Sequence, residues 1–353
     1  MPGDLSHPAL SHKQRKELRP GCPAGYQGND VTFGHHVGRT VHTYLVADTL
    51  LQSVRSFLRD LSSDPYRLYT EHDVQDYSTF LQLSETMSGL EARVMQCSEK
   101  ECSKLGSDIR RGANTARSTD TRGFKENIIA WIQEDGKPVM TLDRKKKSDR
   151  GFHNDSTGRF LCPVSMDWDD PENKDYLRKG YSTKEYGLPT FLWERCEHDP
   201  ENIWKGFLRS DILQCSLNDK QGMKYVFTGP SSVKGSSQAT RLGNAEINGM
   251  TRVTPGSIAY IAMQVYFALS SEKTLKCTSK AAVLYEVLLA DYLYNEEYSE
   301  EVGDLLAWWD KQIFPGTCGK SHQRQAPSQE VARAKIEEKL LTLQTVLAAV
   351  SQV

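Results

Sequence analysis

The segment from Asp149 to Trp168 carries the densest set of reactive side chains in the chain. These side chains belong to Arg150, His153, Asp155, Arg159, Cys162 and Asp167. A cysteine nucleophile, a histidine base and an aspartate that orients the base are the parts of a hydrolytic triad. No elbow turn or helix N-terminus that would activate Cys162 is visible in the sequence. The alternative is that His153 and Asp167 hold a loop together, and we lean toward this interpretation and against an enzyme.

Two groups of histidine and cysteine have side chains that bind metals. The first group is His153, Cys162, Cys196 and His198, and the second is His35, His36 and His42. The first would make a Cys₂His₂ zinc set, but its separations match no common zinc spacing. The second borders a segment without periodicity, so we expect no metal. The sequence also lacks the GxxxxGKS/T and GxGxxG phosphate loops, the kinase motifs and the GxSxG elbow, and we expect no cofactor.

A second arrangement of polar residues precedes a strong helix start at Thr254 and Pro255. Arg241, Asn244 and Arg252 lie just before this start, where the free N–H groups and dipole of a helix attract anions. The alternative is that the asparagine forms a turn and Arg241 pairs with an acidic neighbour. The candidate ligand-binding or anion-binding residues are Arg150, His153, Arg241, Asn244 and Arg252. A ligand-binding function requires these residues to surround one pocket.

The charges are balanced overall but separated along the chain. Lys and Arg number 44 and Asp and Glu number 46, which excludes a uniformly basic protein. Residues 104–150 hold 12 basic and 7 acidic residues, whereas residues 286–310 hold 8 acidic residues and no basic one. The candidate nucleic-acid contacts in the basic region are Arg110, Arg111, Arg144, Lys145, Lys146 and Lys147. The alternatives are a solvated face or neutralisation by the acidic segment.

Apolar periodicity predicts the helices that must position these side chains. Apolar residues recur at alternating spacings of four and three within 38–62 and 71–105, which predicts amphipathic helices, and a third helix is predicted at 125–133. Thr254 and Pro255 form a good helix start, and further helices are predicted at 279–294 and 302–314. The predicted fold is therefore mainly α.

The remaining sequence divides the chain into regions. The expected organisation is a flexible N-terminal arm (1–36), a helical bundle (37–135), a loop-rich middle with a few short strands (136–238), a helical block (239–315), a linker (316–327) and a terminal amphipathic helix (328–353). The terminal helix keeps a heptad spacing of apolar residues for just over two heptads. It either docks on its own domain or joins two copies of the chain.

Secretion and membrane signals are absent from the sequence. The first twenty residues contain no apolar run of signal-peptide length, and no stretch approaches the length of a membrane span. The eight cysteines are scattered without a CxxC motif, as is typical of free thiols in a reducing compartment. We therefore expect an intracellular protein of the cytoplasm or nucleus without membrane contact.

Three stretches carry a resemblance to a known family. They are RGFHNDSTGRFLCPVSMDW (150–168), ATRLGNAEINGMTRVTPGSIAYIAMQVYFALSS (239–271) and EEVGDLLAWWDKQIFP (300–315). Together they resemble a family of mushroom-forming fungi that is defined only as a domain of unknown function, over roughly residues 60–315. The resemblance implies an intracellular fungal protein from an expanded family, of a kind often associated with mobile elements or self-recognition. It implies no activity, cofactor or catalytic residue.

These observations leave three classes of function open. The favoured class is a non-enzymatic interaction protein that binds a protein partner or a second copy through its terminal helix. The second is a nucleic-acid-associated protein that uses the region 104–150. The third is an enzyme or small-ligand binder with its site at 150–168.

Overall fold

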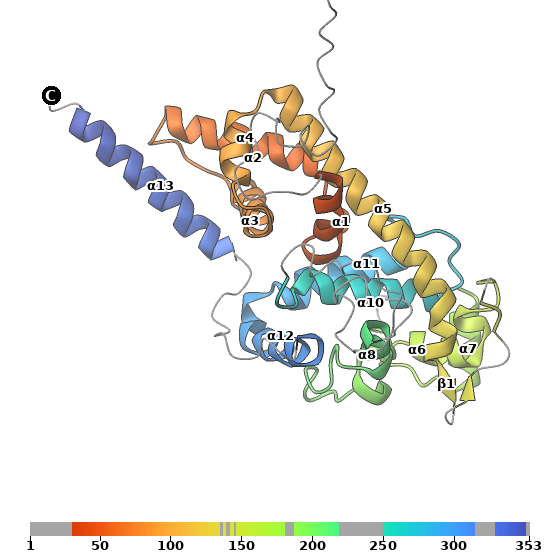
Figure 1. The fold of residues 1–353 in the computed structure, drawn as a ribbon. Coiled ribbons are helices and arrows are strands. Elements are labelled where there is room, and N and C mark those ends of the chain that lie inside the picture. The colour runs from red at the N-terminus through yellow and green to blue at the C-terminus, as the bar shows by residue number, and fades with distance from the viewer. Residues whose placement is uncertain are drawn as a thin grey trace, which may run out of the picture.

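The computed structural model describes residues 30–134, 137–138, 142–144, 146–180, 187–218, 250–314 and 329–350 (Figure 1). In chain order, the elements are α1 (Asp30–Thr40), α2 (Ala47–Ser63), α3 (Glu71–Thr86), α4 (Leu90–Gln96), α5 (Glu99–Trp131), β1 (Gln133–Glu134), β2 (Lys137–Pro138), η2 (Gly151–His153), α6 (Asp155–Leu161), α7 (Pro171–Arg178), η4 (Thr190–Leu192), η5 (Glu194–Cys196), α8 (Asp211–Asn218), α10 (Pro255–Leu269), α11 (Lys280–Val287), η6 (Leu288–Leu293), η7 (Glu296–Tyr298), α12 (Ser299–Ile313) and α13 (Gln329–Val350). The predicted fold class, mainly α, is confirmed.

Two hydrophobic cores organise these helices. The N-terminal core is formed by α1 to α4, the first half of α5 and two residues of α13. The C-terminal core is formed by the second half of α5, the segments around α6 and α8, and α10 to α12. Helix α5 has 33 residues, which corresponds to a length of about 50 Å. It therefore runs alongside both cores, as the long yellow helix in Figure 1 shows.

The apolar stripes predicted from the sequence form most of the N-terminal core, but the helix ends differ. The segment 71–105 was predicted as one helical region and instead contains α3, α4 and the start of α5. Gly89 adopts a left-handed conformation with φ of 78° before α4, and Ser98 begins α5 with a capping box that includes Glu101. The helix predicted at 125–133 is the C-terminal end of α5. Local capping therefore divides a continuous apolar pattern.

Helix α1 corrects the prediction that the flexible arm extends to residue 36. Residues 30–36 are helical, whereas residues 1–29 lie outside the described part of the chain. Gly34 packs on the backbone of Ile109, and Gly38 packs on Ala113, so closely that a Cβ atom would collide in either place. Backbone contact at this distance needs glycine. The small residues therefore let α1 lie directly on α5, and this packing supplies the stabilisation that the local sequence lacks.

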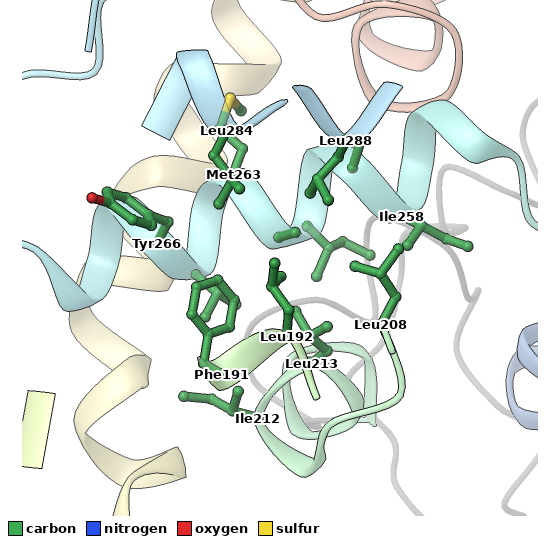
Figure 2. Packing of buried hydrophobic residues seen from close by; sticks show 14 of the residues in the cluster. Phe191, Leu192, Leu208, Ile212, Leu213, Ile258, Met263, Tyr266, Leu284 and Leu288 are labelled. Carbon is green, nitrogen blue, oxygen red and sulfur yellow. The ribbon is translucent and has the colours of Figure 1, made fainter. Parts of the chain in front are cut away.

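Helix α10 forms the centre of the C-terminal core. All of its residues are buried, and Thr254 begins it with a capping box and Pro255 in the first turn, as predicted. Figure 2 shows side chains that cover α10 from opposite sides: Phe191, Leu192, Leu208, Ile212 and Leu213 on one, and Leu284 and Leu288 on the other. A helix that is apolar all round requires such complete cover.

The middle region combines irregular backbone with short elements. The strands β1 and β2, at its start, form a two-stranded antiparallel hairpin. Three short helices, α6, α7 and α8, occur where loops and a few short strands were expected. Asn154 caps α6 and Asp170 caps α7 through their side chains. Trp193 anchors the irregular part, because its Nε1 donates to the carbonyl of Ile203 at 2.9 Å within the core.

Candidate functional site

Arg150 is a structural residue in the centre of the C-terminal half. Its side chain is fully buried, and its guanidinium donates to the carbonyl oxygens of Ala268 at 2.8 Å, Lys125 at 2.9 Å, and Asp143 and Arg144 at 3.2 Å. Burial lowers the pKa of this arginine to about 10. Arg150 therefore joins α5, the segment 142–144 and the C-terminal end of α10, and no ligand reaches it from solvent.

The predicted ligand-binding residues are not gathered around one pocket. His153 is exposed at the end of η2, and Arg252 is exposed before the N-terminus of α10, 3.9 Å from Glu85. Arg150 contacts the opposite end of this helix. A helix of 15 residues separates its ends by about 22 Å, so Arg150 and Arg252 do not share a site. Arg241 and Asn244 lie outside the described residues.

The cysteine of the same segment has the environment of a structural thiol. Cys162 is buried, and its Sγ lies 3.4 Å from the carbonyl oxygen of Met166. Burial and, to a smaller extent, the nearby Asp167 raise the pKa of this thiol to about 11. A catalytic cysteine requires a depressed pKa, so the arrangement opposes thiolate chemistry. Asp167 itself accepts a hydrogen bond from the backbone N–H of Asp169.

Metal binding and membrane spanning have no support among the residues that the structure describes. These residues contain no group of three or more His, Cys, Asp or Glu side chains that could hold a metal ion. None of the described helices is long and apolar enough to cross a membrane. A small pocket between α8, α10 and α12 has an apolar lining of Leu213, Val253, Ile258, Ile261, Trp309 and Ile313. Its lining belongs to the C-terminal core and offers no reactive group.

The predicted nucleic-acid contacts separate into exposed and buried residues. Arg144 and Lys146 are exposed, and Lys145 lies outside the described residues. Lys147 is buried: its Nζ donates to the carbonyls of Phe267 at 2.5 Å and Glu272 at 2.7 Å and lies 3.2 Å from the centre of the Phe267 ring. Burial lowers the pKa of Lys147 to about 7. The prediction that Lys147 contacts nucleic acid is therefore wrong for the folded protein, because its ammonium group is buried against the carbonyls at the C-terminal end of α10.

The other two predicted contacts lie on α5. Arg110 forms an ion pair with Asp48 at 3.4 Å, and Arg111 forms one with Asp108 at 3.0 Å. Both arginines keep exposed side chains. Their ion pairs join neighbouring helices or neighbouring turns, so these contacts stabilise the surface only weakly and leave the guanidinium groups accessible.

A buried ionic network that the sequence did not indicate joins α1, α5 and α10. Arg39 binds Asp120 through two hydrogen bonds, Nε at 2.7 Å and Nη2 at 2.8 Å. The hydroxyl of Tyr260 donates to the same carboxylate at 2.6 Å. These residues are 81 and 140 positions apart from Asp120, so no local spacing signals the contact. The network fixes three helices in place and has no open position for a substrate.

The terminal helix α13 docks on the N-terminal core through its first half. Ala332 and Ile336 are completely buried there. Lys339, at the end of this half, pairs with Glu91 at 2.6 Å. Gln344, in the second half, adds one more contact by donating to the carbonyl of Pro65 at 2.9 Å. Docking on its own chain, one of the two predicted roles, is therefore present in this half of the helix.

The second half of α13 exposes apolar side chains. Leu341, Val346 and Leu347 are 66%, 57% and 47% exposed, and the neighbouring loop adds Tyr66 at 69% and Leu68 at 90%. These five residues are called the apolar end surface. The hydrogen bond from Gln344 to Pro65 holds the loop against the helix, and Figure 1 shows α13 extending away from the other helices toward the C-terminus. Leu341 and Val346 are five positions apart and therefore about 140° apart around the helix axis, so these exposed groups surround the end of α13 and do not form one flat patch.

The loop half of this surface was not predicted from the sequence. Tyr66 and Leu68 follow Pro65 between two helices, where we expected only a helix end. An apolar pair in a short polar connection was the available signal.

Three lysines at 273, 276 and 280 were also missed, because they are spread over a loop and form no continuous basic run.

The described residues define a mainly α-helical protein built on two cores that share one long helix. The chain belongs to a family of unknown function, DUF6698, whose match covers residues 111–314. This confirms the resemblance to a domain of unknown function, although the match begins later than residue 60. No curated protein and no solved structure matches the chain. Helices α1 to α4 and α13 lie outside the matched region.

Proposed function

We propose that this protein is a non-enzymatic interaction protein that associates with a second copy of itself through the apolar end surface. The observation that carries the proposal is the exposure of Leu341, Val346 and Leu347 beside Tyr66 and Leu68. The buried, high-pKa thiol of Cys162 and the scattered ligand candidates support the non-enzymatic part. An intracellular location in the cytoplasm or nucleus belongs to the same proposal.

Burial of the apolar end surface provides the driving force for association. Each large apolar side chain that moves from water into an interface contributes about 1.5–3 kcal/mol before the costs of association. Residues 340–350 contain no charged side chain, so two copies of this segment meet without repulsion. Most soluble oligomers use such self-complementary contacts. A second copy is therefore the partner that this surface fits.

The heptad pattern supports the choice of a second copy. The spacing that places Ile336 on the N-terminal core continues to Leu343 and Leu347. The apolar stripe that docks α13 on its own chain thus continues beyond the buried part of the helix. On this stripe Leu343 is half-buried and Leu347 is exposed, and the exposed part is shorter than a coiled coil requires. Leu341, Val346, Tyr66 and Leu68, which lie off the stripe, are therefore expected to supply the rest of the contact area.

Sedimentation velocity of the full chain over a range of concentrations tests the proposal. We expect a dimer that Leu341→Glu/Leu347→Glu converts to a monomer, because four carboxylates would be placed in the contact. The matched control is Val283→Glu, which charges another exposed apolar residue, 46% exposed on α11, and should leave the dimer intact. A wild-type chain that remains monomeric at high micromolar concentration would contradict the proposal. Circular dichroism checks that every variant remains folded.

A further inference from the structure

Three segments that are distant in sequence meet at the C-terminal end of α10. Arg150 donates to Ala268 in α10, to Lys125 in α5 and to Arg144 in the segment 142–144. Lys147 donates to Phe267 and to Glu272 in the loop after α10. These hydrogen bonds fix the second half of α5, the segments 142–144 and 146–150 and the loop 271–280 side by side.

The hydrogen bonds that close this junction come from cations and end mainly on backbone oxygens. Lys147 and Arg150 are both buried, and among the described residues neither lies within ion-pair distance of a carboxylate. The Arg150 charge therefore adds to the potential at the nearby surface, because carbonyl dipoles stabilise a cation without cancelling its charge. Lys147, with its pKa lowered to about 7, adds only part of a charge near neutral pH. The loop 271–280 is also held to the start of α11, since the backbone N–H of Lys280, the first residue of that helix, donates to Glu272 Oε1 at 3.0 Å.

The surface above this junction is rich in lysine and arginine. Its exposed cations are Arg122, Arg144, Lys146, Lys273, Lys276 and Lys280, and this set is called the basic surface. Lys125 is partly exposed and lies close enough to Lys147 to lower its pKa. The acidic residues on the same three segments are Asp120, Glu126, Asp143, Asp149 and Glu272, and Asp120 is paired with Arg39. With Lys125 and the buried Arg150 included, the basic residues clearly outnumber the acidic ones, without any contribution from Lys147.

The neighbouring face of α5 supplies neutral hydrogen-bonding groups. Asn114, Ser118 and Thr119 are exposed there, and Arg117 donates to the Asn114 side chain and lies 4.6 Å from the ring of Tyr44. Lysine, arginine, amide and hydroxyl groups together are the side chains that contact phosphate and sugar oxygens. The large exposed apolar residues that would insert into a lipid surface are concentrated instead on the apolar end surface.

We propose that the basic surface binds the phosphate backbone of a nucleic acid without reading its bases. This inference uses a different part of the molecule from the self-association proposal and does not depend on it. It also revises the region predicted from sequence: Arg144 and Lys146 remain, Lys147 becomes an internal support, and three lysines of the loop 271–280 are added. Binding should release counterions, so the affinity should fall steeply with salt.

Fluorescence anisotropy with a labelled 20-base-pair DNA duplex, recorded at about 50 and 200 mM salt, tests this proposal. The full chain should bind the duplex, and its affinity should fall by at least about tenfold over this range. The variant Lys273→Gln/Lys276→Gln/Lys280→Gln should lose a further tenfold at low salt and show a smaller salt dependence. A single-stranded RNA probe should give a comparable affinity, because the contact does not involve base pairs.

A matched control separates position from net charge. Lys100→Gln/Lys311→Gln/Lys335→Gln also removes three exposed lysines but leaves the basic surface complete, and it should bind like wild type. The proposal is overturned if neither nucleic acid binds, if both triple variants lose affinity equally, or if the chain binds phosphatidylserine vesicles and no nucleic acid. The monomeric Leu341→Glu/Leu347→Glu variant should keep its intrinsic affinity for the duplex, so failure of self-association would be visible separately.

Discussion

The two hydrophobic cores differ in how they are completed and in their relation to the family. The C-terminal core lies almost entirely within residues 111–314, which define the family match. The N-terminal core lies outside it and takes Ala332 and Ile336 from the far end of the chain. The C-terminal core therefore closes within the matched region, whereas the N-terminal core closes only when α13, from beyond that region, returns to α3. This difference predicts that the N-terminal core is the easier of the two to open.

The two proposed surfaces follow the same division. The apolar end surface belongs to the N-terminal core and α13, outside the family match, whereas the basic surface belongs to segments inside it. Helix α5 connects the two regions through its shared contacts. Association of two copies would therefore bring together two basic surfaces on one particle, and a double contact with one nucleic acid would bind more tightly than a single contact.

The largest effect on the two-core arrangement is expected from Asp120→Ala. This change leaves Arg39 buried without its carboxylate and removes the acceptor of Tyr260. Loss of one partner from a buried ion pair costs about 3–5 kcal/mol. Urea unfolding followed by circular dichroism should show this loss in a transition that involves both cores, because the network joins α1, α5 and α10.

The control for Asp120→Ala is Asp169→Ala. Asp169 also pairs with an arginine, at 2.7 Å from Arg159, but its side chain is 64% exposed. Exposed pairs contribute up to about 1 kcal/mol, so the control should unfold near the wild-type midpoint. Equal losses in the two variants would show that the buried network does not hold the cores together.

The second-largest effect is expected from Ile336→Ala, which should destabilise the N-terminal core and leave the stability of the C-terminal core unchanged. Ile336 is completely buried where α13 meets the N-terminal core. Removal of a buried isoleucine side chain costs about 2–4 kcal/mol because a cavity remains. Hydrogen exchange measured by mass spectrometry should show faster exchange in α2, α3 and α13, with the amides of α10 unchanged.

Val331→Ala is the matched control for this variant. Val331 lies on the same helix, but its side chain is 42% exposed, so its truncation should change exchange very little. If Ile336→Ala accelerates exchange in α10 as much as in α3, the two cores unfold as one unit. The contrast drawn between them would then be wrong.

Local signals in the sequence predicted the parts of the fold that depend on neighbouring residues. The start of α10 at Thr254 and Pro255 and the apolar stripe of α2 are examples, since capping and periodicity act within a few turns. Helix α1 could not be predicted, because its stability comes from Gly34 and Gly38 lying on α5. Division into domains at the proposed boundaries stays a prediction.

The candidate sites were less predictable than the fold. The run Arg144 to Lys147 was visible in the sequence, but the burial of Lys147 depends on carbonyls at the end of α10, 120 residues away. The lysines at 273, 276 and 280 join the basic surface for the same reason, since Glu272 accepts from Lys147. Charge runs therefore indicate composition, whereas tertiary hydrogen bonds decide which cations face solvent.

The smallest effect is a pH dependence that should be confined to the C-terminal core. Burial, with a contribution from Arg150, lowers the pKa of Lys147 from 10.5 to about 7 in the folded protein. Between these two values the unfolded chain binds more protons at this site than the folded chain. The contribution of Lys147 to stability should therefore rise as the pH increases from 7 toward 10.5, by at most about 1.4 kcal/mol per pH unit.

Paired unfolding measurements isolate this contribution. The difference in unfolding free energy between wild type and Lys147→Met should grow in favour of wild type as the pH rises through this window, because methionine does not titrate. Lys146→Met removes an exposed neighbour, and its difference from wild type should stay flat. A Lys147→Met difference that is also flat would mean that the lysine keeps its charge throughout, held by the carbonyls of Phe267 and Glu272 and the Phe267 ring. In that case Lys147 would contribute a permanent rather than a titratable charge to the C-terminal core.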